Sequence, residues 1–348
     1  MSAGGGGGLH TWDSWILGRE EVGTWVVLAL SDGGPGLEER LAAGTHHDVA
    51  RLSAWRTRDF RDHDLITESA FCARPDGPDS GGIWSGCVAP AWFHDPADDR
   101  IRVGRVLFYT SRDVRGGIAP RMAEQRIHCA VAAGSDPLGH EGWRRLERFA
   151  LAADVGPWMR GTDPGEATQG AWRDPHLFRV GTRLFMAVSA KDPEAPPDQR
   201  GCVALLHCPG FDLTRWEPVG TIRPPAGAVC QEMELPHVGR DPRGRLWLTY
   251  ATGGTSEGTD NVGSVAPGQL HALELIPGRS GLESGEHRVL LDTDSVLYGG
   301  WVAPTGDLVG FHKGVGGFAN AGPSDLTLRE DRDLLEVDGL RPRWVLPS

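Results

Sequence analysis

Glycine and proline interrupt this chain so often that long helices have little room to form. The 348 residues include 49 Gly and 25 Pro, and both residue types punctuate regular structure. Between them lie short runs with the composition of β-strands, and helical periodicity is scarce. These runs cover residues 25–30, 106–110, 128–132, 184–188, 203–207, 246–250 and 270–275. Short strands separated by turn residues are typical of an all-β sandwich, barrel or propeller.

A repeated order of elements favours the propeller. The runs at 49–53, 127–132 and 203–207 are each followed by an Asp-containing turn and then by a second strand-like segment. This order fits the outer hairpin of a repeated antiparallel blade. Candidate openings of inner strands recur about every 70 residues, the size of a four-stranded blade with its loops. They are Asp13, Ser85, Asp174, Glu234 and Tyr298.

We therefore predict an all-β fold, a five-bladed β-propeller with four-stranded antiparallel blades around a central pocket. The prediction is one domain over residues 1–348, with a short glycine-rich tail at residues 1–9. In a propeller the first strand of each blade lines the central channel, so residues far apart in the chain converge there.

Composition restricts the classes of partner. Charged residues make up 24% and the hydrophobic set 39%, as in a globular protein, and the net charge is −12. This charge argues against nucleic acid or an anionic membrane as a partner. The sequence contains no stretch of about 18 apolar residues, so we expect no membrane-spanning helix. With no secretion signal visible at the N-terminus, we expect a cytoplasmic protein. The six Cys have neither CxxC pairs nor metal-ligand spacing, so we expect buried free thiols, no metal and no cofactor.

Three acidic motifs carry the candidate chemistry, and Asp13 in the sequence TWDSW is the first of them. A carboxylate between two tryptophans would lie in a partly apolar wall. An Asp that hydrogen-bonds its own turn is the simpler explanation for the motif taken alone. At the start of an inner strand, however, the same carboxylate would face the channel.

The second motif is Arg173-Asp174-Pro175. Pro175 cannot donate to a strand ladder, so it suits a strand start, which would place Asp174 above the channel. The planar guanidinium of Arg173 could bind two sugar hydroxyls at once. The alternative is an Arg–Asp surface pair that precedes a strand.

The third motif contains Glu232 and Glu234, two residues apart and therefore on one face of a strand. Two like charges this close should raise each other's pKa, which could keep one carboxyl protonated as a general acid. A solvated edge strand carrying two glutamates is the alternative. The sequence that follows, Leu235-Pro236-His237, repeats the pattern of Asp174-Pro175-His176, which suggests one blade opening used twice.

Taken together, these motifs resemble glycoside hydrolase family 68, which contains levansucrases, inulosucrases and related β-fructofuranosidases. The resemblance spans residues 11–310 and is carried by Trp12-Asp13-Ser14-Trp15, Trp84-Ser85-Gly86, Arg173-Asp174-Pro175-His176 and Glu232-x-Glu234-x-Pro236-His237. It implies that Asp13 is the nucleophile, Asp174 the transition-state stabiliser and Glu234 the acid/base. It implies further that the substrate is bound by Trp12, Trp84, Ser85, Arg173, Glu232 and, by a looser match, Tyr298.

The sequence departs from the family pattern at two places. Residues 251–255 lack the Arg or His that commonly helps to hold the glucosyl part of sucrose. Gln231 stands where many bacterial members have a calcium-binding Asp, so we do not expect that calcium site.

The expected activity is that of a retaining glycoside hydrolase or transferase on β-fructofuranosides, acting on a small carbohydrate through a covalent fructosyl-aspartate. Two other classes stay open. One is an inverting propeller enzyme similar to the arabinan-cleaving families, and the other is a non-catalytic sugar-binding propeller. The sequence does not determine the glycoside, the balance of hydrolysis and transfer, or the oligomeric state.

Overall fold

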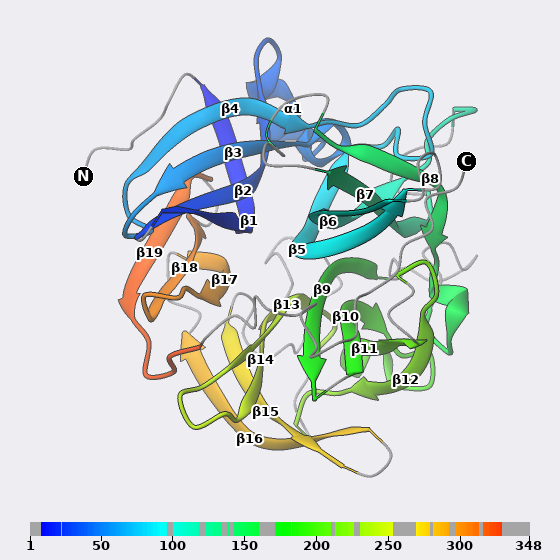
Figure 1. Ribbon diagram of the computed structural model, residues 1–348, viewed down its shortest axis with the longest axis vertical. Coiled ribbons are helices and arrows are strands. Elements are labelled where there is room, and N and C mark those ends of the chain that lie inside the picture. The colour runs from blue at the N-terminus through cyan, green and yellow to red at the C-terminus, as the bar shows by residue number, and fades with distance from the viewer. Residues whose placement is uncertain are drawn as a thin grey trace.

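Five antiparallel sheets form a ring in the computed structural model (Figure 1), and the chain passes through them in order around the ring. The predicted five-bladed β-propeller is therefore confirmed. The structure describes residues 8–21, 23–95, 100–117, 123–133, 138, 142–159, 171–181, 183–209, 213–225, 230–252, 269–278, 281–291, 297–312 and 316–328.

Each of the first four blades is a four-stranded sheet made from one continuous part of the chain. The first contains β1 (Leu9–Glu21), β2 (Thr24–Gly33), β3 (Arg51–Thr57) and β4 (His63–Phe71), and the second contains β5 (Ile83–Asp95), β6 (Arg100–Arg112), β7 (Gln125–Ala133) and β8 (Arg144–Leu151). The third contains β9 (Trp172–Val180), β10 (Arg183–Lys191), β11 (Gly201–Cys208) and β12 (Glu217–Ile222), and the fourth contains β13 (Met233–Arg240), β14 (Leu246–Thr252), β15 (Leu270–Pro277) and β16 (Leu282–Leu291).

The fifth blade has three strands within the described residues, β17 (Leu297–Val302), β18 (Asp307–His312) and β19 (Phe318–Pro323). The prediction of four strands per blade thus holds for the first four sheets. Among the described residues, which end at 328, no further strand pairs with β19. Leu326 and Leu328 instead pack between the fourth and fifth blades, beside Trp247 and Val302.

Apolar side chains fill the space between each pair of neighbouring blades. In β6, Val106 and Phe108 pack toward the third blade, whereas Leu107 and Tyr109 pack toward the first. This alternation follows from the two-residue period of a strand. Because both faces of a middle strand are covered, its sequence is apolar at nearly every position. That is why the short apolar runs could be identified from sequence.

The seam between the fifth and first blades closes the ring. Its core contains Phe60 from the β3–β4 turn and Trp301 from β17, whose rings meet edge to face at 5.7 Å between centroids. Phe318 of β19 stacks on His63 of β4 at 3.7 Å. The described residues of the two sheets share no strand pairing across this seam. Side-chain packing holds it, together with hydrogen bonds from the Gly317 N–H to the Thr11 carbonyl at 2.7 Å and from Asn320 Nδ2 to the Phe60 carbonyl at 3.3 Å.

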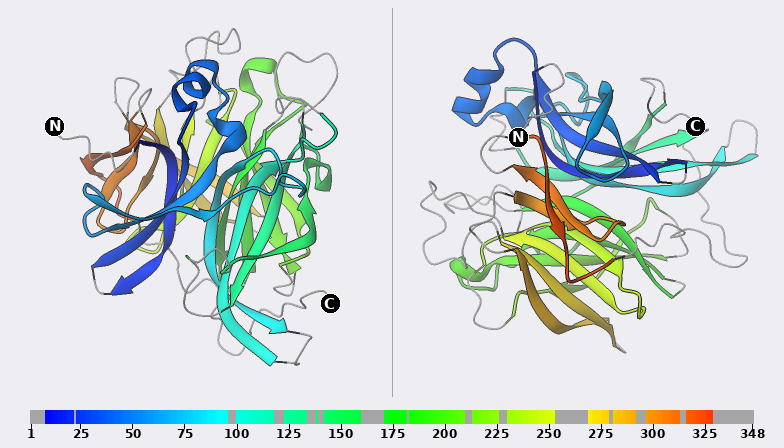
Figure 2. Two further views of the ribbon diagram at one scale, coloured as in Figure 1. Left: turned by 90° about the horizontal axis from the view of Figure 1, so that it is seen from above. Right: turned by 90° about the vertical axis from the view of Figure 1, so that its left-hand side faces the viewer.

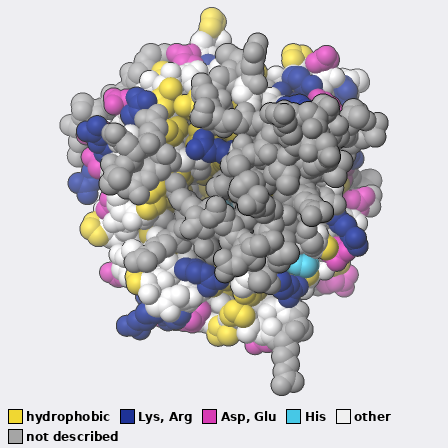
Figure 3. Space-filling model, viewed as in Figure 1, with side chains coloured by type: hydrophobic (Ala, Val, Ile, Leu, Met, Phe, Trp, Pro, Cys, Tyr) yellow, Lys and Arg dark blue, Asp and Glu magenta, His cyan; other side chains and the backbone are white. Residues whose placement is uncertain are grey.

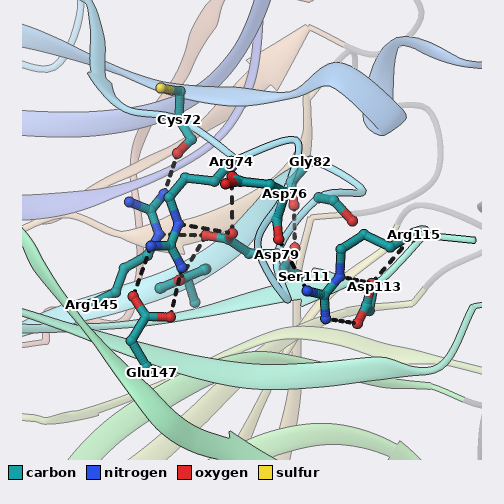
Figure 4. Close-up of polar contacts among 12 residues, drawn as sticks. Cys72, Arg74, Asp76, Asp79, Gly82, Ser111, Asp113, Arg115, Arg145 and Glu147 are labelled. Atoms are coloured by element: carbon teal, nitrogen blue, oxygen red, sulfur yellow. Dashed lines mark hydrogen bonds and ion pairs between the residues drawn. The ribbon is translucent and has the colours of Figure 1, made fainter.

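The connection between β4 and β5, residues 72–82, is fixed by a buried carboxylate (Figure 4). Asp79 accepts hydrogen bonds from Tyr109 Oη at 3.1 Å and from Arg145 Nε at 2.6 Å. Ser111 Oγ donates to the carbonyl of Gly82 at 2.5 Å. Because β5 begins directly after Gly82, this network sets the path of its first residues.

The helix α1 (Leu37–Ala43) and the 3-10 helix η1 (His46–Val49) lie in the connection between β2 and β3. Figure 2 shows α1 standing away from the strands on one side of the ring. On the face seen in Figure 3, acidic and basic side chains are interspersed around the rim. None of the helices that the structure describes is long and apolar enough to cross a membrane.

Candidate active site

The first strand of every blade has an irregularity in its pairing at the predicted position. The register shifts lie between Trp12 and Ser14 in β1, between Ile83 and Gly86 in β5, and between Tyr298 and Trp301 in β17. β9 and β13 have the same irregularity beside Asp174 and Glu234. A β-bulge bends a strand and re-aims a side chain, and bulges are common next to active sites.

Three non-glycine residues in these bulges have positive φ angles. The values are 26° for Asp13, 58° for Asp174 and 51° for Leu235. Backbone in this region costs free energy for residues with a Cβ and persists only where the surroundings hold it. Pro175 accordingly lies inside β9, in the bulge, and not at the strand start that we predicted.

Asp13 of the first blade is held by the second blade. Ser85 Oγ donates a hydrogen bond of 2.5 Å to Asp13 Oδ2. Ser85 is 3% exposed, so water does not compete for this contact. The hydroxyl fixes the direction of the carboxylate and replaces one of the hydrogen bonds that water would otherwise donate to it.

Thr110 connects Asp174 to Ser85, the residue that holds Asp13. Its Oγ1 donates to the carbonyl of Ser85 at 3.2 Å and accepts from the backbone N–H of Asp174 at 2.9 Å. The Asp174 carboxylate in turn accepts the backbone N–H of Leu235 at 3.1 Å. Three blades are thus joined through one threonine and one aspartate. Thr110 was not predicted as a site residue, because nothing in a strand sequence shows which hydroxyl faces a bulge in the next blade.

Arg173 bridges the two glutamates. Its Nη2 lies 2.8 Å from Glu232 Oε2 and 2.6 Å from Glu234 Oε1, and its Nε lies 3.8 Å from Asp174 Oδ2. Lys191 Nζ lies 3.1 Å from the other oxygen of Glu232. Lys191 was not predicted from the sequence as a part of the site.

The start of β17 contacts two carboxylates. Tyr298 Oη donates a hydrogen bond to Glu234 Oε2. Gly299 has a φ of +63°, and a Cβ built on it would lie 3.2 Å from Asp13 Oδ1. Asp13 and Glu234, from the first and fourth blades, therefore both adjoin the Tyr298-Gly299 dipeptide of the fifth.

Burial governs the protonation of these groups. It raises the pKa of Asp13 to about 8, assisted by the charges of Asp174 and Glu234 and opposed by the Ser85 hydrogen bond. It also raises the pKa of Glu234 to about 7, although Arg173 opposes the shift. The pKa of Asp174 is raised by burial as well. Carboxyls that leave water favour their neutral form unless a cation compensates.

Glu232 behaves in the opposite way. Burial alone would raise its pKa, but the positive charges of Arg173 and Lys191 outweigh burial and lower it to about 2. Our expectation that the two glutamates raise each other's pKa was therefore wrong for Glu232. The reason is that both cations contact Glu232, whereas Glu234 has only Arg173 and the neutral Tyr298.

The two predicted tryptophans lie beside this cluster, on either side of η1. The Trp12 ring meets His47 edge to face at 5.2 Å, and Trp84 Nε1 donates to the His47 carbonyl at 2.9 Å. The guanidinium of Arg112 lies over the Trp84 ring at 4.0 Å. His47 and Arg112 were not found from sequence, because η1 reaches these rings from a connection whose path the strand pattern does not predict.

Among the described residues, no group of three or more His, Cys, Asp and Glu is arranged to hold a metal ion. Residues 253–255, which belong to the predicted departure from the family pattern, lie outside the described residues. What the described residues bring together is a set of buried and half-buried carboxyls with unequal proton affinities, held by Ser85, Thr110, Arg173 and Tyr298.

Several solved structures have a similar fold. An inulosucrase from Halalkalicoccus jeotgali bound to kestose shares 20% identity and a TM-score of 0.58, covering 90% of this chain and 77% of its own. A levansucrase mutant from B. megaterium shares 15% identity and a TM-score of 0.54, with 92% and 81% covered. A β-fructofuranosidase mutant from Microbacterium saccharophilum shares 13% sequence identity with a TM-score of 0.56, and the match covers 97% of this chain and 74% of that protein.

The comparisons of the sequence itself found no match. Neither a protein-family model nor a curated protein matches this chain. The likeness to the solved structures therefore shows the fold: this chain has the five-bladed propeller that those carbohydrate-active enzymes have.

Proposed function

We propose that this chain is a retaining glycoside hydrolase or transferase that acts on β-fructofuranosides. The observation that carries the proposal is the placement of Asp13 and Glu234. The two carboxyls come from different blades, both adjoin Tyr298-Gly299, and each is held by one hydroxyl. Paired carboxyls that flank one position are the usual requirement for cleaving a glycosidic bond. The fold shared with the inulosucrase and levansucrase supports fructosides as the substrate class.

In the first step, the ionised Asp13 carboxylate attacks the anomeric carbon of the fructosyl unit. The bond to the leaving oxygen breaks, and protonated Glu234 gives its proton to that oxygen. The product is a fructosyl ester of Asp13 and a free alcohol, with Glu234 left ionised. The raised pKa of Glu234 suits an acid that must hold a proton near neutral pH.

In the second step, ionised Glu234 takes a proton from water or from a sugar hydroxyl. The oxygen so activated attacks the anomeric carbon and displaces Asp13, which returns the carboxylate and gives net retention of configuration. Asp174 would stabilise the positive charge that develops on the ring in both steps. Arg173 and Glu232 would bind fructosyl hydroxyls, with Trp12 and Trp84 as apolar walls.

The test is incubation of the purified protein with sucrose, short fructans and aryl arabinofuranosides, with chromatography of the products. We expect fructose or fructans from at least one fructoside. Asp13→Asn and Glu234→Gln should each lower kcat by at least about a thousandfold, as removal of a reacting group does in other enzymes. Asp113→Asn, which changes an exposed aspartate paired with Arg115, is the matched control and should keep activity.

Two further measurements address the mechanism. With fructosyl fluoride, whose leaving group needs no acid, Glu234→Gln should accumulate a protein adduct one fructosyl unit heavier. Proton NMR of the first product formed should show the β anomer. Inversion would assign the chain to the single-displacement class, and an absence of product from every fructoside would remove the proposed substrate class.

A further inference from the structure

Lysine is rare in this chain, which makes the position of Lys191 informative. Of the 35 basic residues only Lys191 and Lys313 are lysine. The Lys191 side chain is 5% exposed and contacts Glu232. A buried ammonium is costly unless it is paired. An arginine, the residue that this chain uses almost everywhere else, would carry the same positive charge on a larger head group.

The backbone around Lys191 brings Glu232 to it. Lys191 pairs with Gly201 across β10 and β11. A Cβ on Gly201 would lie 2.6 Å from the backbone N of Glu232 and 2.9 Å from the carbonyl oxygen of Cys230. Only glycine therefore allows the segment before β13 to lie directly on this strand pair. The Gly201 N–H donates to that Cys230 carbonyl at 2.9 Å, which fixes the approach.

A chain of contacts leads from Lys191 to the proposed acid/base. Lys191 holds one oxygen of Glu232, and Arg173 Nη2 holds the other at 2.8 Å. The same Nη2 reaches Glu234 at 2.6 Å. One nitrogen thus serves both glutamates, and its position depends on where Glu232 is held. Without Lys191, the second oxygen of Glu232 would compete for the Arg173 fork.

We propose that Lys191 is a positioning residue that fixes Glu232, and thereby keeps Arg173 bridged between Glu232 and Glu234 and controls the acid/base group. Only the acid/base role given to Glu234 in this inference rests on the proposed function. The contacts themselves do not depend on which glycoside is cleaved. Lys191 does not touch the reacting atoms in this scheme and acts through Glu232 and Arg173.

The charged groups that face Glu234 come from several blades. Arg173 and Asp174 belong to β9, Glu232 precedes β13, Tyr298 belongs to β17 and Asp13 to β1. Loss of the Lys191 charge makes this environment more negative by one unit. Because added negative charge favours the protonated form of a carboxyl, the pKa of Glu234 should rise.

The experiment measures Glu234 directly and needs no substrate. The protein is labelled with glutamate carrying ¹³C at the side-chain carboxyl, and the Glu234 resonance is assigned by its loss in Glu234→Gln. Its chemical shift is then titrated in wild type, Lys191→Met and Lys191→Arg. We expect the midpoint to rise by at least about half a pH unit in Lys191→Met and to stay near wild type in Lys191→Arg, which keeps the charge.

Arg223→Met is the matched control. Arg223 is a neighbouring cation, but it pairs with Asp192 through a 2.9 Å contact of its Nε and leaves Glu232 untouched. It should not move the Glu234 titration. If Lys191→Met does not fold, Lys191→Gln, which keeps a hydrogen-bond donor, should give the same upward shift.

An unchanged Glu234 midpoint in both neutral variants would overturn the proposal, and so would a shift in Lys191→Arg as large as in Lys191→Met. If fructosides are substrates, the acid limb of kcat/KM, which belongs to the free protein, should move upward with the Glu234 midpoint. If no fructoside is cleaved, the proposed function fails, yet the titration still decides whether Lys191 controls Glu234.

Discussion

Asp13 and Glu234 are both half-buried carboxyls, but their partners differ in kind. Asp13 is bonded to the Ser85 hydroxyl, and Glu234 to the charged Arg173 and the Tyr298 hydroxyl. A hydroxyl compensates less for lost hydration than a guanidinium does. Asp13, which must be ionised for attack in the proposed mechanism, therefore holds its proton more tightly in the free protein than Glu234 does, with a pKa of about 8 against about 7.

This ordering predicts a bell-shaped pH dependence of kcat/KM. The reactive form carries one proton on the pair, on Glu234. Below about pH 7 both carboxyls are protonated and Asp13 cannot attack; above about pH 8 neither is protonated and Glu234 cannot donate. Initial rates measured from pH 4 to 10 should peak between these values, and the two midpoints belong to the coupled pair. A plateau of full activity between pH 4 and 6 would contradict this ordering.

At the scale of elements, the bulges in the inner strands do what regular strands cannot. A regular strand points successive side chains to opposite faces, toward the two neighbouring blades. The bulges turn Asp13, Asp174 and Glu234 out of that alternation. Glycine serves the same purpose in β17, where Gly299 lets Asp13, Leu235 and Phe311 approach closely.

Gly299→Ala should therefore displace Asp13. The new Cβ would lie 2.6 Å from Phe311 Cε1, 2.8 Å from Leu235 Cδ1 and 3.2 Å from Asp13 Oδ1. We expect kcat to fall by about a hundredfold, the effect of a shift of about 1 Å in a reacting group. Gly322→Ala is the control, because Gly322 also has a positive φ, of +89°, but has no atom within 4 Å of its Cβ position. Equal losses in the two variants would mean that backbone strain and not displacement is responsible.

The inner strands were predictable from sequence because their motifs repeat, although Asp13 and Asp174 lie inside β1 and β9 and not at the predicted strand starts. The apolar runs between them were predictable because middle strands are covered on both faces. The bulges were not predictable, since no local pattern shows that the non-glycine residues Asp13 and Asp174 adopt positive φ angles. Thr110 and Lys191 were missed for another reason. Each acts on a residue of a different blade, and no local pattern records which side chains meet across a ring.

At the scale of the whole molecule, the seam between the fifth and first blades closes the ring through side-chain packing and a few hydrogen bonds, without strand pairing between the described residues of the two sheets. Phe60 is 2% exposed there and contacts both Trp25 and Trp301. Large aromatic side chains supply most of the contact area in such a cluster. Truncation at this point should loosen the ring without breaking any strand pairing.

Phe60→Ala should lower the free energy of unfolding by about 3 kcal/mol, the usual effect of removing a buried aromatic side chain. In a urea titration, enzymatic activity should be lost at a lower concentration than far-UV circular dichroism, because opening the seam separates Asp13 from Gly299 before the sheets unfold. Val49→Ala is the control, since Val49 is 49% exposed. Coincident loss of both signals would show that seam and sheets unfold together.

Every blade is built from one uninterrupted stretch of chain, while the proposed reacting groups are divided among the blades. A cut between two blades therefore leaves each sheet intact but distributes the catalytic groups over two polypeptides. Fragments divided between β8 and β9 would each be inert, and turnover would return only on reassociation, which makes this propeller suited to fragment complementation.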